Sequence, residues 1–246
     1  MELVTTGVKY LPGFLHEATR SVRGRVVNGR SARPVTQELA QTYFEQRSDA
    51  GHGMDDVIES SSLPYRALLS SKLVRASLRP LNRASRVLDY GCGRGGLYST
   101  LRRAGFSGKY FGYDVDRIGI TRLQETGQHD DATFSTRIKS VGFDLAFLCN
   151  VLVYNDDGAA SKALEELASL AGTSSQLIVL EPFPRWYWEF VFDGIRLQAR
   201  GPDAISSLLM SAGWEPREWA AVSLLCLGNI PVCKIAYAVL ANAAKR

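Results

Sequence analysis

The sequence predicts an α/β fold, a mostly parallel sheet with helices on both of its faces. From residue 86 onward, short apolar segments alternate with segments whose apolar residues recur at helical spacing. The apolar segments are almost uninterrupted, which is typical of strands buried on both faces. A glycine-rich turn follows the first of them and leads into the first helix. Repeated strand–helix units of this kind indicate a parallel sheet between two helical layers.

The predicted elements follow one another regularly along the chain. Apolar runs place strands at residues 86–90, 109–114, 131–135, 143–150 and 175–182. Amphipathic segments place helices at residues 95–104, 116–124, 158–172 and 201–213. Gly105 and Gly213 stand at the ends of two of these helices, where glycine is common. Asp156 and Asp157 precede a third as capping residues.

The apolar segment from Trp219 to Ala244 is long enough to raise the question of a membrane span. Lys234 is its only charged residue, and a spanning helix needs about 20 apolar residues. Residues 228–231, Gly-Asn-Ile-Pro, interrupt the segment near its middle. We therefore expect the two strands of a hairpin and no membrane contact.

Residues 1–80 differ from the rest and predict a helical extension or cap in front of a core domain at residues 81–246. An arm between residues 20 and 33 contains five arginines and no acidic residue. Two segments, 34–49 and 63–81, have the spacing of amphipathic helices. We expect this extension to act as a lid or as the contact of a homodimer.

The composition is that of an ordinary globular protein, with 46% hydrophobic and 22% charged residues and a net charge of +4. The four cysteines form no C-x-x-C pair and match neither a disulfide framework nor a zinc site. We therefore expect no bound metal and a reducing compartment, the cytoplasm. The first 20 residues also lack the basic start and apolar stretch of a signal peptide.

The stretch VLDYGCGRGG, residues 87–96, fits two kinds of cofactor loop. It contains the G-x-G-x-x-G of dinucleotide-binding enzymes, and also the D-x-G-x-G-x-G of enzymes that bind S-adenosylmethionine. In both, the glycines let the backbone turn sharply and approach the ligand. Asp89 favours the second, because its carboxylate would repel a diphosphate but attract the ammonium and sulfonium groups of S-adenosylmethionine.

Asp114 follows the next strand, where an acidic side chain can accept hydrogen bonds from both ribose hydroxyl groups of an adenosyl cofactor. Dinucleotide enzymes carry a similar acid about 20 residues after the glycine loop. Asp114 alone therefore does not distinguish the two cofactors. A helix cap beside Asp116 is the alternative role.

The segments VLDYGCGRGG, YFGYDVD, FDLAFLCNVLVYNDD and LIVLEPF occur in the order and spacing of the class I S-adenosylmethionine-dependent methyltransferases, and the sequence resembles this family from about Arg86 onward. The resemblance implies a Rossmann-like seven-stranded sheet, parallel except for its last strand, and S-adenosylmethionine as the cofactor. It places Asp89, Gly91, Cys92 and Gly93 around the methionine part, Asp114 at the ribose, Val115 on the adenine, and Asn150 on the methionine and substrate side. The third strand lacks an acid for the adenine amino group, and Thr136 stands at that place.

Methyl transfer from a sulfonium is a displacement in line with the departing sulfur, so near-attack positioning can supply most of the acceleration. A base is needed only when the acceptor is protonated. The catalytic candidates are Tyr154 after the fourth strand, Glu181 at the end of the fifth, and His52 in the extension. A tyrosine, with a reference pKa near 10, more often shapes a pocket than takes a proton. Glu181 pairs with Arg185 in the alternative interpretation.

The segment 182–192, PFPRWYWEFVF, is the densest aromatic patch. It follows the fifth strand, where loops lie over the ligand crevice of an α/β sheet. Trp186 and Tyr187 are therefore candidate substrate-binding residues together with Tyr154, for an apolar or aromatic acceptor. Contact with the cap or with a second subunit fits them equally well. These features favour methyl transfer to an oxygen or nitrogen of a small-molecule metabolite.

A nucleic-acid methyltransferase is the main alternative, because the arginine-rich arm could contact phosphates and aromatic side chains could stack on bases. However, no Asn-Pro-Pro-aromatic tetrad follows the fourth strand, and Cys149-Asn150 stand where the Asp of a Lys-Asp-Lys-Glu set would be. A nicotinamide-dependent oxidoreductase and a cofactor-binding module without turnover are further alternatives. The intact set of Asp89, glycines and Asp114 argues against the latter.

Overall fold

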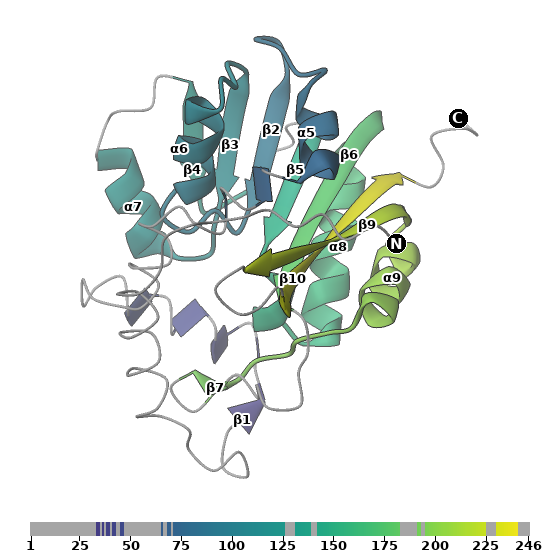
Figure 1. Cartoon of the computed structure of the whole chain (residues 1–246). Helices are drawn as coiled ribbons and strands as arrows, with labels where there is room; N and C mark the ends of the chain where they lie inside the picture. The colour runs from purple at the N-terminus through teal and green to yellow at the C-terminus, as the bar shows by residue number, and fades with distance from the viewer. Residues whose placement is uncertain are drawn as a thin grey trace.

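The computed structural model describes residues 33–34, 36, 38–39, 41–42, 45–46, 65, 68–69, 71–125, 131–138, 142–182, 191–192, 195–224 and 230–240. A seven-stranded sheet lies at its centre (Figure 1). Its strands are β2 (Arg86–Tyr90), β3 (Lys109–Tyr113), β4 (Ala132–Ser135), β5 (Phe143–Cys149), β6 (Ala171–Pro182), β9 (Trp214–Leu224) and β10 (Ile230–Leu240).

The order of the strands across the sheet is β4-β3-β2-β5-β6-β10-β9. Neighbours from β4 to β6 pair in parallel, whereas β10 is antiparallel to both β6 and β9. The prediction of a sheet that is parallel except for its last strand is therefore confirmed. The apolar segment that ends the sequence supplies β10 and the second half of β9, as expected for a hairpin. Among the helices in the described ranges, none combines the length and the hydropathy that a bilayer crossing requires.

Two strands begin earlier than the sequence pattern predicts. Strand β6 begins at Ala171, where polar residues follow the preceding helix, and β9 begins at Trp214 and includes Pro216. Strand β9 is an edge strand that pairs only with β10, and an edge strand tolerates proline because one side of its backbone needs no partner. The pairing also shifts register between Tyr237 and Ala238, next to the proline.

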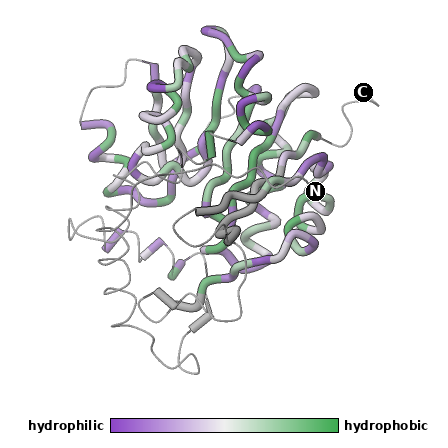
Figure 2. Tube along the Cα trace, viewed as in Figure 1, coloured by the Kyte–Doolittle hydropathy of each residue, from purple (hydrophilic) through white to green (hydrophobic). Residues whose placement is uncertain are grey.

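Helices cover both faces of the sheet (Figure 1). One face carries α5 (Lys72–Leu78), α6 (Gly96–Arg103) and α7 (Arg117–Glu125), and the other carries α8 (Asp157–Leu170) and α9 (Pro202–Ser211). Alternate strand residues face the two layers, so the core has two halves. Val87 packs toward α6, and Leu88 packs toward α8. Because side chains are buried on both faces, the central strands are nearly continuous apolar segments, and they form the hydrophobic centre of Figure 2.

The described part of the amino-terminal extension joins this core. Leu68 and Val74 are fully buried in the same cluster as Leu97 and Leu101 of α6. A second, three-stranded sheet of two-residue strands has the order β1-β8-β7, made of β1 (Arg33–Pro34), β7 (Val191–Phe192) and β8 (Ile195–Arg196). It lies below the large sheet in Figure 1. The end of the arginine-rich arm therefore meets the connection between β6 and α9, while the predicted boundary at residue 80 stays a prediction.

Candidate active site

The loop between β2 and α6 turns on three glycines with positive φ angles, Gly91 at 81°, Gly93 at 50° and Gly95 at 75°. Residues with a Cβ rarely adopt such angles. The N–H groups of Gly91 and Cys92 both donate to the carbonyl oxygen of Tyr113, at 2.7 and 2.9 Å. The loop is thereby tied to the end of β3. It lies at the carboxyl ends of two central strands, which is the edge where α/β sheets bind ligands.

Asp114 lies beside this loop and is hydrogen-bonded to it. Its Oδ2 atom accepts the N–H of Gly93 at 2.8 Å, and its Oδ1 atom accepts the N–H of Asp116 at 2.9 Å. Burial raises the pKa of Asp114, and hydrogen bonds from the backbone N–H groups of Asp116, Gly93 and Val115 act against that shift. An ionised carboxylate offers about four acceptor positions. Three of them are engaged by backbone N–H groups, so acceptor capacity for a ribose hydroxyl group remains.

Asp89 is 2% exposed, and the hydroxyl group of Tyr110 donates to its Oδ2 atom. Burial raises the pKa of Asp89 to about 7; the hydrogen bond from Tyr110 lowers it, and the nearby charge of Asp114 raises it. Burial and the charge of Asp89 raise the pKa of Tyr110 in turn. A cation nearby would favour the ionised form of Asp89. Near neutral pH the buried carboxyl of Asp89 is therefore partly protonated in the folded protein.

The other predicted cofactor residues lie at the same edge of the sheet. Val115 and Thr136 are half-buried at the ends of β3 and β4, and the N–H of Asp114 donates to the carbonyl of Ser135 at 3.2 Å, which brings the two strand ends together. Cys92 is buried, and its side chain points toward Gly112 in the core. Any contact of Cys92 with a cofactor would therefore use its backbone.

Asn150 redirects the chain at the end of β5. Its φ of 56° makes it the only non-glycine residue with positive φ among the residues that the structure describes, and asparagine tolerates this region better than most residues. Its N–H donates to the carbonyl oxygen of Leu180 at 2.7 Å. A short 3-10 helix, η1 (Leu152–Tyr154), follows. Between them Val151 packs against the glycine loop, where a Cβ at Gly91 would lie 2.3 Å from Val151 Cγ2.

Glu181 does not face open space at the end of β6, as its predicted catalytic role would require. The side chain is 2% exposed, and its two oxygens accept the N–H groups of Leu152 at 2.8 Å and Val153 at 3.0 Å. Tyr154 ends the same turn and is half-buried. His52, Trp186, Tyr187 and Arg185 lie outside the described residues.

The sequence matches the family model of a methyltransferase domain over residues 64–218, more than half of the chain. The match includes the glycine loop, Asp114, the η1 turn and Glu181. The chain belongs to the class I S-adenosylmethionine-dependent methyltransferases. No protein with a curated description matches it in sequence.

Solved structures share the fold of this methyltransferase. Magnesium protoporphyrin IX methyltransferase (ChlM) from Synechocystis PCC 6803, with S-adenosylhomocysteine bound, superposes with a TM-score of 0.60 at 21% identity, over 82% of this chain and 98% of that one. A putative methyltransferase in complex with the Haloferax volcanii Trm112 activator gives 0.61 at 14% identity, over 80% and 97%. The pyocyanin biosynthetic protein PhzM gives 0.62 at 13% identity, over 92% and 68%. At these identities the likeness establishes the fold.

S-adenosylmethionine fits the residues that this methyltransferase presents. The glycine loop offers backbone without side chains at positions 91 and 93, the Asp114 carboxylate lies beside that loop, and a cationic ligand would favour the ionised form of Asp89. In the described ranges, no group of three His, Cys, Asp or Glu side chains lies close enough together to bind a metal ion.

Arg200 is a residue of the methyltransferase site that the sequence did not indicate. It is 6% exposed and donates to the carbonyl oxygens of Leu152 at 2.5 Å and Asn155 at 2.7 Å. Its Nε also donates to Asp157 at 2.9 Å. A single arginine between two elements belongs to no motif, and only the three-dimensional structure brings it to the η1 turn.

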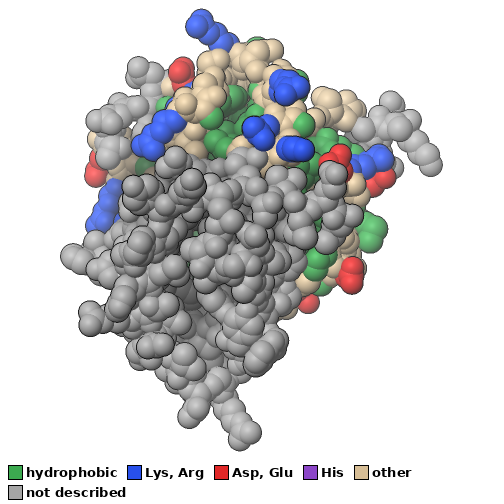
Figure 3. All heavy atoms as spheres, viewed as in Figure 1, with side chains coloured by type: hydrophobic (Ala, Val, Ile, Leu, Met, Phe, Trp, Pro, Cys, Tyr) green, Lys and Arg blue, Asp and Glu red, His purple; other side chains and the backbone are tan. Residues whose placement is uncertain are grey.

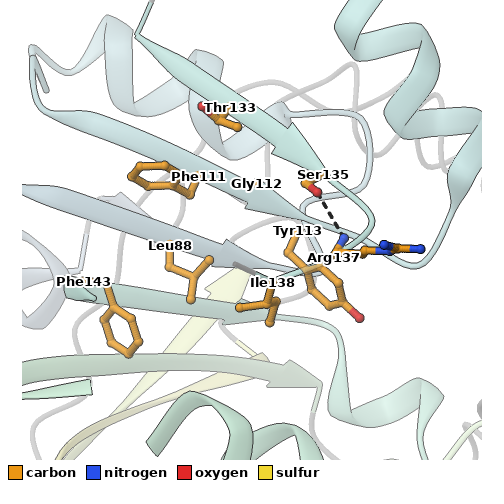
Figure 4. A pocket seen from close by; sticks show the side chains of 9 residues that line it. All are labelled: Leu88, Phe111, Gly112, Tyr113, Thr133, Ser135, Arg137, Ile138 and Phe143. Carbon is orange, nitrogen blue, oxygen red and sulfur yellow. Dashed lines mark hydrogen bonds between the residues drawn. The ribbon is translucent and has the colours of Figure 1, made fainter. Parts of the chain in front are cut away.

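A small cavity of about 50 Å³ lies on the α8 side of β3 and β4 (Figure 4). Its lining is mainly apolar and includes Phe111, Tyr113 and Ile138, with the N–H of Arg137 hydrogen-bonded to Ser135 at its edge. Binding pockets for small ligands usually measure about 300–1,000 Å³. This cavity is therefore too small to be the acceptor pocket of the methyltransferase.

Proposed function

We propose that this methyltransferase transfers the methyl group to an oxygen or nitrogen atom of a small-molecule metabolite. The observation behind the proposal is the η1 turn: Val151, just before it, packs against Gly91 of the glycine loop, and Tyr154 is its last residue. A half-buried tyrosine at this place suits contact with a compact apolar or aromatic acceptor. The names of two proteins of similar fold, a porphyrin methyltransferase and a pyocyanin biosynthetic protein, are consistent with such acceptors.

The bound cofactor supplies an electrophilic methyl group on a sulfonium. The protein's part is to hold the acceptor in line with that methyl group and to exclude water. Asp114 and the glycine loop fix the position of the adenosyl end, and Val151 and Tyr154 border the methyl end. Tyr154 is proposed to shape this border, because a neutral phenol accepts a proton poorly. Glu181 is not proposed as a base, because both of its oxygens already bind backbone N–H groups.

The alternative, a nucleic-acid methyltransferase, is favoured by exposed basic residues. Arg79, Arg83, Arg86, Arg103 and Lys109 are all exposed, and lysines and arginines gather over the upper part of the molecule in Figure 3. These five residues stand at the end of α5, in the connection to β2, at the starts of β2 and β3 and at the end of α6, which is the edge of the sheet opposite the glycine loop. Phosphate contacts there would not deliver a base to the cofactor. This geometry supports the small-molecule proposal.

The test is to supply the protein with S-adenosylmethionine labelled on its methyl group, together with either a dialysable metabolite fraction or total RNA and DNA. We expect label in the metabolite fraction, and none with an Asp114→Ala variant. Tyr154→Phe should retain turnover at a reduced rate if the ring shapes the site. Label in the nucleic-acid fraction, lost at moderate salt as phosphate contacts would be, would overturn the proposal in favour of the alternative.

A further inference from the structure

Both ends of the η1 turn are held by buried charged side chains from distant elements. The N–H groups at the start of a helical turn and the C=O groups at its end have no partners within it. Glu181 of β6 binds the N–H groups of Leu152 and Val153. Arg200, before α9, binds the carbonyl oxygen of Asn155 just after the turn and also that of Leu152, which accepts the Asn155 N–H within the turn as well. One residue, Leu152, is thus held on its N–H side by a carboxylate and on its C=O side by a guanidinium.

Burying a charged side chain costs free energy, so the filling of space does not by itself explain Glu181 and Arg200. A buried carboxylate or guanidinium loses its hydration and is tolerated only with good hydrogen-bond partners. The partners here are mostly backbone groups of one turn. The planar fork of arginine reaches two carbonyl oxygens at once, which the point charge of a lysine does not do equally well. Asp157, whose side chain is 70% exposed, balances the charge of Arg200.

The held turn directly follows the contact between Val151 and the glycine loop. Asn150 keeps a left-handed backbone at φ 56°, and a non-glycine residue stays there only when its surroundings determine its conformation. Val151 follows it, and Tyr154 N–H and the Asn155 side-chain amide both donate to the Val151 carbonyl oxygen, at 3.1 and 2.7 Å. Val151 Cγ2 therefore stays in the space left by the missing Cβ of Gly91.

We propose that Glu181 and Arg200 are positioning residues of the cofactor site. They fix the η1 turn from both ends, and through it they hold Val151 against Gly91 and so set the shape of the glycine loop that receives S-adenosylmethionine. Neither side chain touches the cofactor in this role. The proposal depends on the cofactor and not on the acceptor, so an error in the proposed acceptor class leaves its test intact.

The test measures the affinity for S-adenosylhomocysteine by calorimetry, well below the unfolding temperature of each variant. Glu181→Gln replaces one acceptor oxygen by a donor that faces an N–H group, and Arg200→Lys removes the fork. We expect each to weaken binding about tenfold. Glu165→Gln and Arg217→Lys make the same chemical changes on exposed residues of α8 and β9, and we expect them to bind like the wild type. Should Glu181→Gln not fold, Glu181→Asp, which keeps both oxygens but withdraws them, carries the same test.

A double-mutant cycle separates positioning from general stability. Val151→Ala removes the side chain through which the turn acts on Gly91. If Glu181 acts through Val151, Glu181→Gln should weaken S-adenosylhomocysteine binding in the wild-type background and have little further effect in the Val151→Ala background. Two results would overturn the proposal. One is a variant of Glu181 or Arg200 that lowers the unfolding temperature but binds normally. The other is an effect of equal size in both backgrounds.

Discussion

Val151 occupies the space that a Cβ at Gly91 would fill, since its Cγ2 atom lies 2.3 Å from that position. Any residue other than glycine at position 91 must therefore displace Val151 or the loop. Because Gly91 follows β2 and Val151 follows β5, this contact joins the ends of two neighbouring strands. The shape of the glycine loop therefore depends on the position of Val151, just before the η1 turn.

Gly91→Ala should destabilise the protein and weaken S-adenosylhomocysteine binding. It adds the strain of a left-handed alanine, about 1–2 kcal/mol, to an overpacking cost of about 1–3 kcal/mol. Gly105→Ala is the matched control, because Gly105 has a φ of 91° and nothing within 4 Å of an added Cβ. Urea denaturation should show the larger loss for Gly91→Ala. Equal losses for the two variants would contradict the contact with Val151.

Asp114→Ala should weaken S-adenosylhomocysteine binding at least tenfold without unfolding the chain. It removes the acceptor positions that face the proposed ribose and frees the Gly93 N–H. Asp116→Ala is the control, because Asp116 caps α7 through the N–H of Gly119 at 3.0 Å. A lost cap lowers the free energy of unfolding by about 1 kcal/mol and should leave the affinity nearly unchanged. Calorimetry that shows unchanged binding for Asp114→Ala would count against its assignment.

The stability of the protein should fall with rising pH because of Asp89. Burial raises its pKa from 3.8 to about 7, so between these values the folded protein keeps a proton that the unfolded chain releases. The stabilisation is complete below pH 3.8 and is lost as the pH rises through about 7. Asp89→Asn removes this dependence and keeps an acceptor for Tyr110. Denaturation at pH 5, 6, 7 and 8 measures the free energy of unfolding of both proteins. That of Asp89→Asn should increase relative to that of the wild type as the pH rises. A difference that stays constant with pH would refute the raised pKa of Asp89.

Binding near neutral pH should release protons, because the cationic ligand favours the ionised form of Asp89. Tyr110→Phe should extend this release to higher pH, since the lost hydrogen bond no longer lowers the pKa of Asp89. Calorimetry with S-adenosylmethionine, which carries the sulfonium charge, in buffers of different ionisation enthalpy measures the proton count. Tyr90→Phe is the control, because the Tyr90 hydroxyl binds Glu166 in the other half of the core. The same proton count at pH 8 for Tyr110→Phe and wild type would contradict this account.

The features that the sequence predicted correctly are local. The strand at 86–90, the positive-φ glycine loop and the cap at Asp156 each depend on residues within a few positions of one another, as does the break that makes the last segment a hairpin. Asp156, for instance, accepts the N–H of Ala159 at 2.8 Å, as its place before a helix predicts. The start of β9 was missed because Pro216 and its charged neighbours resemble a loop until the edge position of the strand is known.

The features that the sequence did not reveal depend on distant residues. Leu152 is 29 residues from Glu181 and 48 from Arg200, and no spacing rule links them. The role of Glu181 was accordingly predicted from its place at a strand end, while its carboxylate is turned inward to the η1 turn. Asn150 gave no local sign of its left-handed backbone. The hydrogen-bond partner of Asp89 could not be predicted either. In the sequence, Tyr110 is simply one of several aromatic residues in a predicted strand.

The position of β10 has a consequence for synthesis on the ribosome. Strand β10 lies between β6 and β9 and is the only partner of β9 in the sheet. While residues 230–240 are still in the exit tunnel, β6 therefore has an unpaired edge and β9 has no neighbour to bind. The cofactor loop and its supporting strands emerge much earlier, so the nascent chain can assemble them first. Until β10 emerges, the β6 edge carries unpaired N–H and C=O groups, which is the feature that favours pairing with a strand of another chain.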